Sequence, residues 1–242
     1  MCYHIHQACN LWQFFDSGHL KMPDLLPGER FEGRRKMPGG KKIIFLGDSI
    51  TDAGHNFQLI REGEAGLGDG YVRRIAAMLN GEEADIRNAG HDGFTVQGLL
   101  RMLEWDCLRH SPDMVSILVG CNDAAVCMNT GRMLDEIGFA ESYQRLLRRI
   151  REGTRARILC MGPFIFPCPL EYRNWIPLIR EIEAAEQEAA REAGALFIPL
   201  HELLNREAEA VGYDRITVDG IHLTERGAEI IACEWIKRAE FI

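Results

Sequence analysis

Five short apolar runs, each bounded by glycine or proline, recur along residues 41–200 of this chain. They read KIIFLGDS, ADIRNAG, MVSILVG, RILCMGP and ALFIPL, and they begin at intervals of roughly 30 to 45 residues. Runs of this length with so few polar residues are typical of strands that are buried on both faces. Because helical stretches separate the runs, we expect the strands to pair in parallel through crossover helices.

Helical periodicity is clearest in five stretches. These are Gly70 to Leu79, Val96 to Arg109, Gly138 to Glu152, Trp175 to Ala193 and about Glu225 to Ala239. Right-handed crossovers place such helices on both faces of a sheet. We therefore predict an α/β fold, a three-layer α/β/α sandwich with a five-stranded parallel sheet in the flavodoxin-like order 2-1-3-4-5. Sheets of this kind bind ligands beyond the carboxyl ends of their strands.

The first 40 residues lack this alternation. They contain several prolines and lead into the run RRKMPGGKK, a composition typical of a linker. We predict an irregular extension over residues 1–40 and one domain over residues 41–242. Four side chains in the extension are potential zinc ligands, namely Cys2, His4, His6 and Cys9. Their spacing matches no standard finger, so we expect neither a metal nor an organic cofactor.

Composition narrows the classes of partner. The net charge of −8 argues against nucleic acid or an anionic membrane as the main partner. No apolar run reaches the length of a membrane span, and the short apolar stretch near the N-terminus follows no basic region of a signal peptide. The eight cysteines form no CxxC pair, and several lie inside apolar runs. We therefore expect reduced core thiols in a cytoplasmic protein that acts on a small molecule.

Four polar strings are placed where this topology would bring them to one edge of the sheet. They are GDSIT at 47–51, NAGHDG at 88–93, GCND at 120–123 and DGIH at 219–222. The first three follow predicted strands, and the fourth precedes the last helix. In the first string, Ser49 is a candidate nucleophile on a tight turn, where Asp48 can bond local backbone groups. The alternative is a plain turn with a capping serine.

The last string supplies a candidate base. Asp219 and His222 are three residues apart across a glycine-containing turn, so the carboxylate can orient the imidazole. The alternative is a surface histidine near an unrelated acid. Asn122 and Gly93 offer an amide side chain and an unobstructed backbone N–H, which are donors suited to a developing oxyanion. The alternative for Asn122 is a helix cap, and Gly93 can serve loop geometry alone.

These residues together resemble the SGNH-hydrolase superfamily, also called the GDSL esterases and lipases, from about Lys41 to the C-terminus. Ser49 matches the nucleophile of that family, and the pair Asp219 and His222 matches its catalytic dyad. Asn122 matches the asparagine of the oxyanion hole. The resemblance implies a serine esterase that forms an acyl-enzyme and needs no metal.

The second string matches the family pattern N-x-G-x-S-G. On that pattern, Gly93 rather than Gly90 is the oxyanion glycine, and Asn88 is the supporting residue that opens the string. The implied oxyanion hole consists of the backbone N–H groups of Ser49 and Gly93 together with Asn122. Asp92 departs from the pattern, because serine is usual beside the oxyanion glycine.

A narrower resemblance rests on the strings IIFLGDSITDAG, GLGDGY and WDCLRHSPDMVSILVGCND. These are similar to the intracellular carbohydrate acetylesterases of the acetylxylan-esterase type. The resemblance implies removal of acetyl groups from oligosaccharides and assembly into homo-oligomers. Two other functions fit the same residues, namely hydrolysis of longer acyl esters or thioesters, as by a lysophospholipase, and binding of an acylated carbohydrate without catalysis.

Overall fold

The computed structural model describes residues 40–56, 66–79 and 84–239 of the 242-residue chain. Five strands form one parallel sheet. They are β1 (Lys41–Gly47), β2 (Ala84–Gly90), β3 (Met114–Leu118), β4 (Arg157–Met161) and β5 (Leu196–Ile198). Their order across the sheet is β2-β1-β3-β4-β5, which confirms the predicted sandwich and strand order. The predicted extension over residues 1–40, with its potential zinc ligands, lies outside the described residues apart from Gly40.

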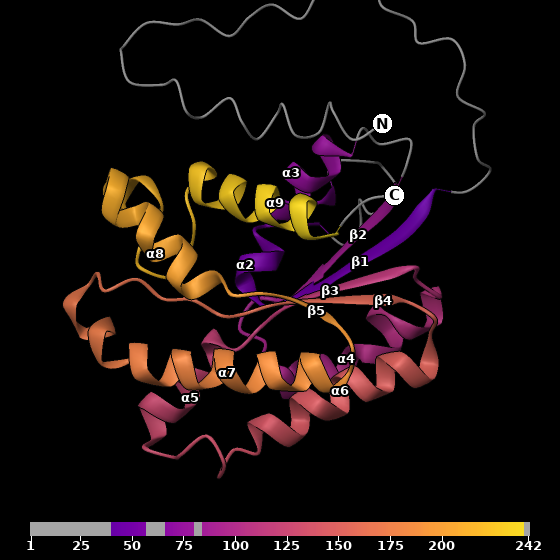
Figure 1. Ribbon diagram of the computed structural model, residues 1–242, viewed down its shortest axis with the longest axis horizontal. Helices are drawn as coiled ribbons and strands as arrows, with labels where there is room; N and C mark the ends of the chain where they lie inside the picture. Colours follow the sequence, from indigo (N-terminus) through magenta and orange to yellow (C-terminus); the bar gives the residue numbers. More distant parts are fainter. Residues whose placement is uncertain (1–39, 57–65, 80–83, 240–242) are drawn as a thin grey trace, which may run out of the picture. The chain divides into compact units, whose positions relative to one another are not determined.

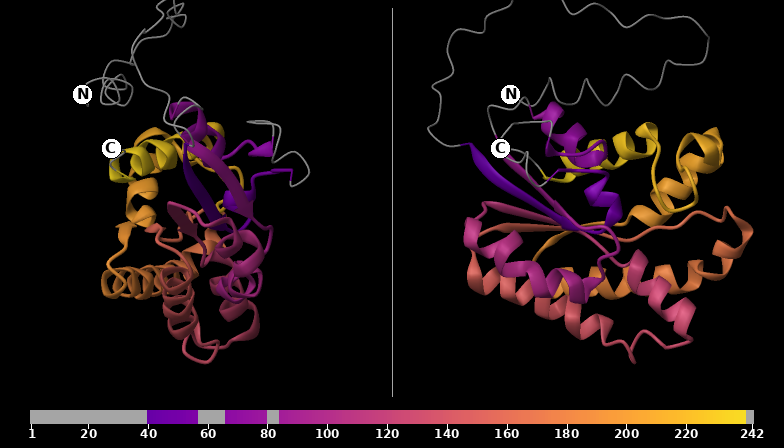
Figure 2. Two further views of the ribbon diagram at one scale, coloured as in Figure 1. Left: turned by 90° about the vertical axis from the view of Figure 1, so that its right-hand side faces the viewer. Right: turned by 180° about the vertical axis from the view of Figure 1, so that it is seen from behind.

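Helices cover both faces of the sheet (Figures 1 and 2). One face carries α3 (Tyr71–Met78), α8 (Leu200–Val211) and α9 (Glu225–Ala239), and the other carries α4 (Val96–Asp106), α5 (Cys121–Thr130), α6 (Phe139–Gly153) and α7 (Ile176–Glu192). Short 3-10 turns lie at Leu108–His110, Leu170–Asn174 and Tyr213–Arg215. Each face has its own apolar core, in which β1 contributes Ile44 and Leu46 to one side and Ile43 and Phe45 to the other. This alternation follows from the two-residue period of a strand.

Two helices of ten or more residues were absent from the sequence prediction. Helix α8 buries Leu200, Leu204 and Ala208, a spacing that fits one helical face. The helical spacing is therefore present in the sequence. The prediction did not separate this helix from the apolar run of β5, which it follows directly. Helix α5 has no comparable apolar face, because polar and small residues alternate along it. Its residues Ala124 and Cys127 lie in the core of this face and α5 contacts α7, so its formation depends on packing rather than on periodicity.

The carboxyl ends of β1 and β2 meet at two glycines. Gly47 and Gly90 are partners in the parallel register. A Cβ at position 47 would lie 2.1 Å from Thr51 Oγ1, and one at position 90 would lie 2.3 Å from the backbone nitrogen of Asp52. The absence of side chains at both positions lets the short helix α2 (Ser49–Asp52) fold back onto the sheet edge.

Six cysteines lie in the described part of the chain, and all are free. Cys107, Cys121, Cys127 and Cys160 are buried, as expected for core thiols. Burial raises the pKa of Cys160 to about 12, so this thiol stays protonated and inert. Within the same residues, no group of three or more histidine, cysteine, aspartate or glutamate side chains could hold a metal ion. No described helix is both long and apolar enough to cross a bilayer.

We predict that Asn88→Leu lowers the free energy of unfolding by about 2–4 kcal/mol, because buried backbone groups lose their partners. The fully buried Asn88 amide donates to the carbonyls of Thr51 (2.7 Å) and Leu67 (2.9 Å), and its oxygen accepts from Gly90 N–H (2.9 Å). Urea denaturation measures the effect. The exposed Asn129→Ala serves as control, and equal losses in the two variants would contradict the prediction.

Candidate active site

Ser49 is the first residue of α2 and follows β1 directly through Asp48. The Asp48 side chain caps the helix by accepting a hydrogen bond from Ile50 N–H at 3.0 Å. Asp48 is 1% exposed, whereas Ser49 is partly exposed. The capped turn therefore presents the Ser49 hydroxyl at the surface and keeps its carboxyl neighbour in the interior.

The loop before α9 brings His222 to that hydroxyl. His222 Nε2 lies 3.0 Å from Ser49 Oγ, although the two residues are 173 positions apart in the sequence. His222 Nδ1 lies 2.7 Å from Asp219 Oδ2. A serine, an imidazole and a carboxylate thus form a continuous hydrogen-bonded chain. With a carboxylate accepting from Nδ1–H, the unprotonated Nε2 is left free to accept the serine proton.

The loop is built so that Asp219 accepts several hydrogen bonds. Its Oδ1 accepts from the backbone N–H groups of Ile221 (2.9 Å) and His222 (2.7 Å). Partial burial raises the pKa of the Asp219 carboxyl, but the hydrogen bonds from the His222 side chain and from these two N–H groups outweigh it. The net pKa is below the usual value, so Asp219 is ionised at neutral pH.

The candidate oxyanion donors lie on two further loops. Gly93 has φ +72°, a conformation that favours glycine, and a Cβ there would contact nothing within 4 Å. Asn122 is the second residue of α5, and its Nδ2 donates to the carbonyl of Phe94 at 3.0 Å. This bond uses one of the two amide hydrogens and fixes the orientation of the other. In the described part of the chain, the N–H groups of Ser49 and Gly93 donate to no protein acceptor.

Cross-bonds hold these loops against the Ser49 turn. The backbone N–H of His91 donates to the carbonyl of Gly47 at 3.0 Å. The backbone N–H of Asp92 donates to Asp52 Oδ2, the carboxyl group at the end of α2, at 3.2 Å. Asp92, which stands where the family pattern has serine, is itself exposed. Its charge is therefore solvated rather than buried beside Gly93.

Asp123 is a site residue that the sequence analysis missed, although it lies inside the string GCND. It is 2% exposed, and both its carboxyl oxygens lie within 3.3 Å of Val96 N–H at the start of α4. Burial raises the pKa of Asp123 to about 7 despite this bond. Asp123 therefore anchors the far end of the loop that carries Gly93. Its partner is 27 positions away, so no local pattern indicated it.

Aromatic side chains flank the histidine loop. The ring of Tyr172 lies against Gly220, where a Cβ would be 2.8 Å from Tyr172 Cδ2. Tyr172 and Trp175 pack together with ring centroids 5.2 Å apart. Tyr172 thus packs against the Asp219–His222 turn, and Trp175 packs against Tyr172.

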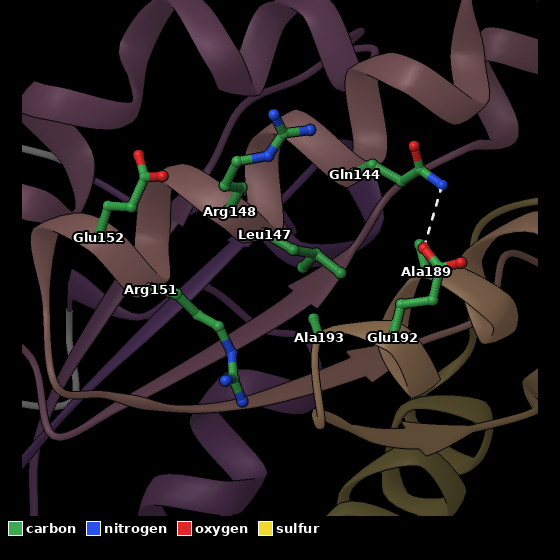
Figure 3. A pocket seen from close by; sticks show the side chains of 8 residues that line it. All are labelled: Gln144, Leu147, Arg148, Arg151, Glu152, Ala189, Glu192 and Ala193. Atoms are coloured by element: carbon green, nitrogen blue, oxygen red, sulfur yellow. Dashed lines mark hydrogen bonds between the residues drawn. The ribbon is translucent and has the colours of Figure 1, made fainter.

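A separate surface hollow lies between α6 and α7 (Figure 3). Its apolar floor includes Leu147, Ala189 and Ala193, and Gln144 donates to Glu192 across one end. Apart from Gln144, the lining residues belong to the C-terminal half of α6 and to the last turn and C-cap of α7, which lead back toward the amino ends of the strands. The hollow is therefore at the opposite edge from Ser49 and takes no part in the site.

Known proteins resemble the chain over most of its length. A model of the GDSL-like lipase/acylhydrolase family matches residues 45–230. The chain belongs to this family. An acetylxylan esterase from Geobacillus stearothermophilus is 28% identical over 219 residues, which cover 85% of this chain and 97% of that protein. This GDSL-family protein is accordingly a carboxylic ester hydrolase.

Solved structures share the fold of this GDSL-family hydrolase. The acetylxylan esterase crystal structure from the same organism aligns with a TM-score of 0.73 and 25% identity, covering 86% of this chain and 98% of that one. A structure described as a GDSL-like lipase from Parabacteroides merdae gives a TM-score of 0.75 and 25% identity, covering 84% and 98%. Catalytic mutants of the Geobacillus enzyme replace a serine, an aspartate or a histidine with alanine.

We predict that the wild-type protein loses stability as pH rises from 4 to 7, partly because of Asp48, and that Asp48→Asn removes this part of the loss. Burial raises the pKa of Asp48 from 3.8 to about 7, opposed by the Ile50 N–H bond and by the charge of His222. In this window the folded protein binds a proton that the unfolded chain does not, so the free energy of unfolding falls as pH rises. At about 1.4 kcal/mol per pH unit, the contribution of Asp48 is at most about 4 kcal/mol.

Urea denaturation at pH 4, 6 and 8 measures this effect. Asp48→Asn should gain stability relative to wild type as pH rises to 7, and the difference should stay constant above that pH. Asp214→Asn, at an exposed position, is the matched control. A pH-independent difference between Asp48→Asn and wild type would contradict the prediction.

Proposed function

We propose that the protein is a serine esterase that removes short acyl groups, chiefly acetyl, from carbohydrate esters. Ser49 is the nucleophile, His222 the general base, and Asp219 orients and stabilises the imidazole. The observation that carries the proposal is the hydrogen-bonded chain from Ser49 Oγ through His222 to Asp219. The catalytic serine, aspartate and histidine of the Geobacillus enzyme support it, because that aspartate and histidine are also three positions apart.

Hydrolysis proceeds in two steps. His222 Nε2 takes the proton as Ser49 Oγ attacks the ester carbonyl, and the negative oxygen is held by the N–H groups of Ser49 and Gly93 and by the Asn122 amide. His222 then protonates the leaving alcohol and leaves an acyl-serine. Water, activated by the same imidazole, releases the acid and restores Ser49. Asp219 remains ionised throughout, in keeping with its lowered pKa.

Two observations favour an acetylated carbohydrate. The matching relative is an acetylxylan esterase. In addition, the side chains of His222 and Asp219 are 49% and 50% exposed, so the side from which the leaving alcohol is protonated is open to solvent. An open leaving-group side suits a large hydrophilic alcohol. The proposal also includes a cytoplasmic location, a domain that spans residues 41–242, and assembly into homo-oligomers.

Hydrolysis of longer acyl esters is the second candidate. Leu170 and Val218 are apolar yet 69% and 74% exposed. Val218 immediately precedes Asp219, and Leu170 lies in the segment between Cys168 and Tyr172, both of which touch Gly220. An acyl chain of eight carbons could cover such side chains, whereas an acetyl group could not.

We expect Ser49→Ala to lose turnover of 4-nitrophenyl acetate by about 10⁶-fold, as serine hydrolases do without their nucleophile. Labelling by a fluorophosphonate should be lost with it, because only an activated serine reacts. The exposed Ser111→Ala should keep both properties. Wild-type turnover in Ser49→Ala would refute the triad, and wild-type protein that resists the label would indicate a binding protein.

The preferred acyl length distinguishes deacetylation from hydrolysis of longer acyl esters. We expect kcat/KM for 4-nitrophenyl acetate to exceed that for the octanoate by at least about tenfold, since each methylene that fits poorly costs about 1–3 kcal/mol. Release of acetate from acetylated xylo-oligosaccharides should accompany this preference. A preference for octanoate would favour the lipid-directed alternative.

A further inference from the structure

Gly93 sits in a tight turn whose ends are His91 and Phe94. The N–H of Phe94 donates to the carbonyl of His91 at 3.1 Å, which closes a four-residue turn. Gly93, third in the turn, has φ +72°, whereas Asp92 is not among the described residues with positive φ. A positive φ at the third residue but not at the second fits a type II turn. The N–H of Gly93 belongs to the central peptide of that turn, so the turn type decides where this N–H points.

The side chains at the two ends of the turn, His91 and Phe94, contact each other. The rings of His91 and Phe94 stack with centroids 4.2 Å apart and an angle of 16° between their planes. Phe94 also packs over Gly98, where a Cβ would lie 2.9 Å from its ring. The stack therefore joins the turn to the first part of α4.

His91 also reaches the last residue of α4. Its Nε2 lies 2.7 Å from Asp106 Oδ2, and the two side chains are 16% and 6% exposed. A hydrogen bond shielded from water is stronger and better defined than an exposed one. Since Ser49 Oγ is engaged by His222, His91 is not part of the triad. This second histidine–aspartate pair is used by no step of the mechanism above.

We propose that His91 and Asp106 are positioning residues that fix the central peptide of the 91–94 turn, and thereby aim the Gly93 N–H at the oxyanion. The proposal rests on the serine-esterase function. Oxyanion donors act only within about 2.7–3.1 Å of the developing charge, so a loosened turn weakens transition-state binding. The two side chains are only 16% and 6% exposed and act through the turn, so we expect ground-state binding of the substrate to change little.

Matched substitutions at position 91 test the proposal. His91→Phe keeps a ring to stack on Phe94 but removes the donor to Asp106. His91→Gln places an amide N–H near the position of Nε2 and restores that donor. For 4-nitrophenyl acetate we expect kcat to fall by about 10–100-fold in His91→Phe, the range that follows from misplacing a catalytic group by about 1 Å. KM should stay within about twofold, and His91→Gln should recover most of the lost kcat.

The same signature should appear at two other positions. Asp106→Ala should lower kcat as His91→Phe does, and the double variant should be no worse than either single one, because the pair acts as a unit. Gly93→Ala should also lower kcat, since φ +72° disfavours alanine although its Cβ meets no neighbour. Glu202→Ala, which breaks the exposed Arg180–Glu202 ion pair, is the control and should leave kcat unchanged.

Binding of methylboronic acid provides a second readout. Its tetrahedral adduct on Ser49 places an oxygen in the oxyanion hole, so its Ki should rise in parallel with the loss of kcat. Urea denaturation identifies variants that remain folded at the assay temperature. Unchanged kcat in folded His91→Phe, or a rise in KM alone, would overturn the proposal. If Ser49→Ala stays active, the proposed function fails instead, so the two failures are distinguishable.

Discussion

The turn that carries Ser49 occupies the space that side chains at positions 47 and 90 would fill. Gly47 and Gly90 are register partners at the ends of adjacent strands, and a Cβ on either would strike α2. Only with both side chains absent can α2 lie on the sheet edge. There the Asn88 amide donates to the carbonyls of Thr51 and Asp52. The placement of Ser49, the proposed nucleophile, therefore depends on close packing between backbones rather than on any contact made by the serine itself.

Three of the carboxyl groups around that turn, those of Asp48, Asp123 and Asp219, illustrate how burial sets their charge. Asp48 and Asp123 are both almost fully buried and have pKa values raised to about 7, mainly by desolvation. Asp219, half exposed and surrounded by N–H donors, has a lowered pKa. The only one of the three that contacts His222 directly is thus the one that stays fully ionised at neutral pH. The buried pair can be neutral, which limits repulsion beneath the site.

Much of the fold was predictable because its signals are local. The apolar runs located all five strands, and the structure confirms the flavodoxin-like order that five such strands suggested. Helix α5 was not predictable in this way, since its residues show no apolar face. The motifs around Ser49, Asn122 and His222 could be found because the residues of each motif lie within a few positions of one another in the sequence. Contacts such as Asp123 with Val96 or His91 with Asp106 join separate strings, and neither partner carries a pattern that indicates the other.

Two segments far apart in the sequence supply the proposed reacting pair. Ser49 follows the first strand, and His222 lies just before the last helix, 173 positions later. During synthesis, the serine emerges from the ribosome long before its base exists. A nascent or truncated chain that lacks α9 and the loop before it has an ordinary, unactivated hydroxyl at this position. Under the proposed mechanism, competence for hydrolysis therefore appears only after the loop before α9 has been synthesised and has docked beside Ser49.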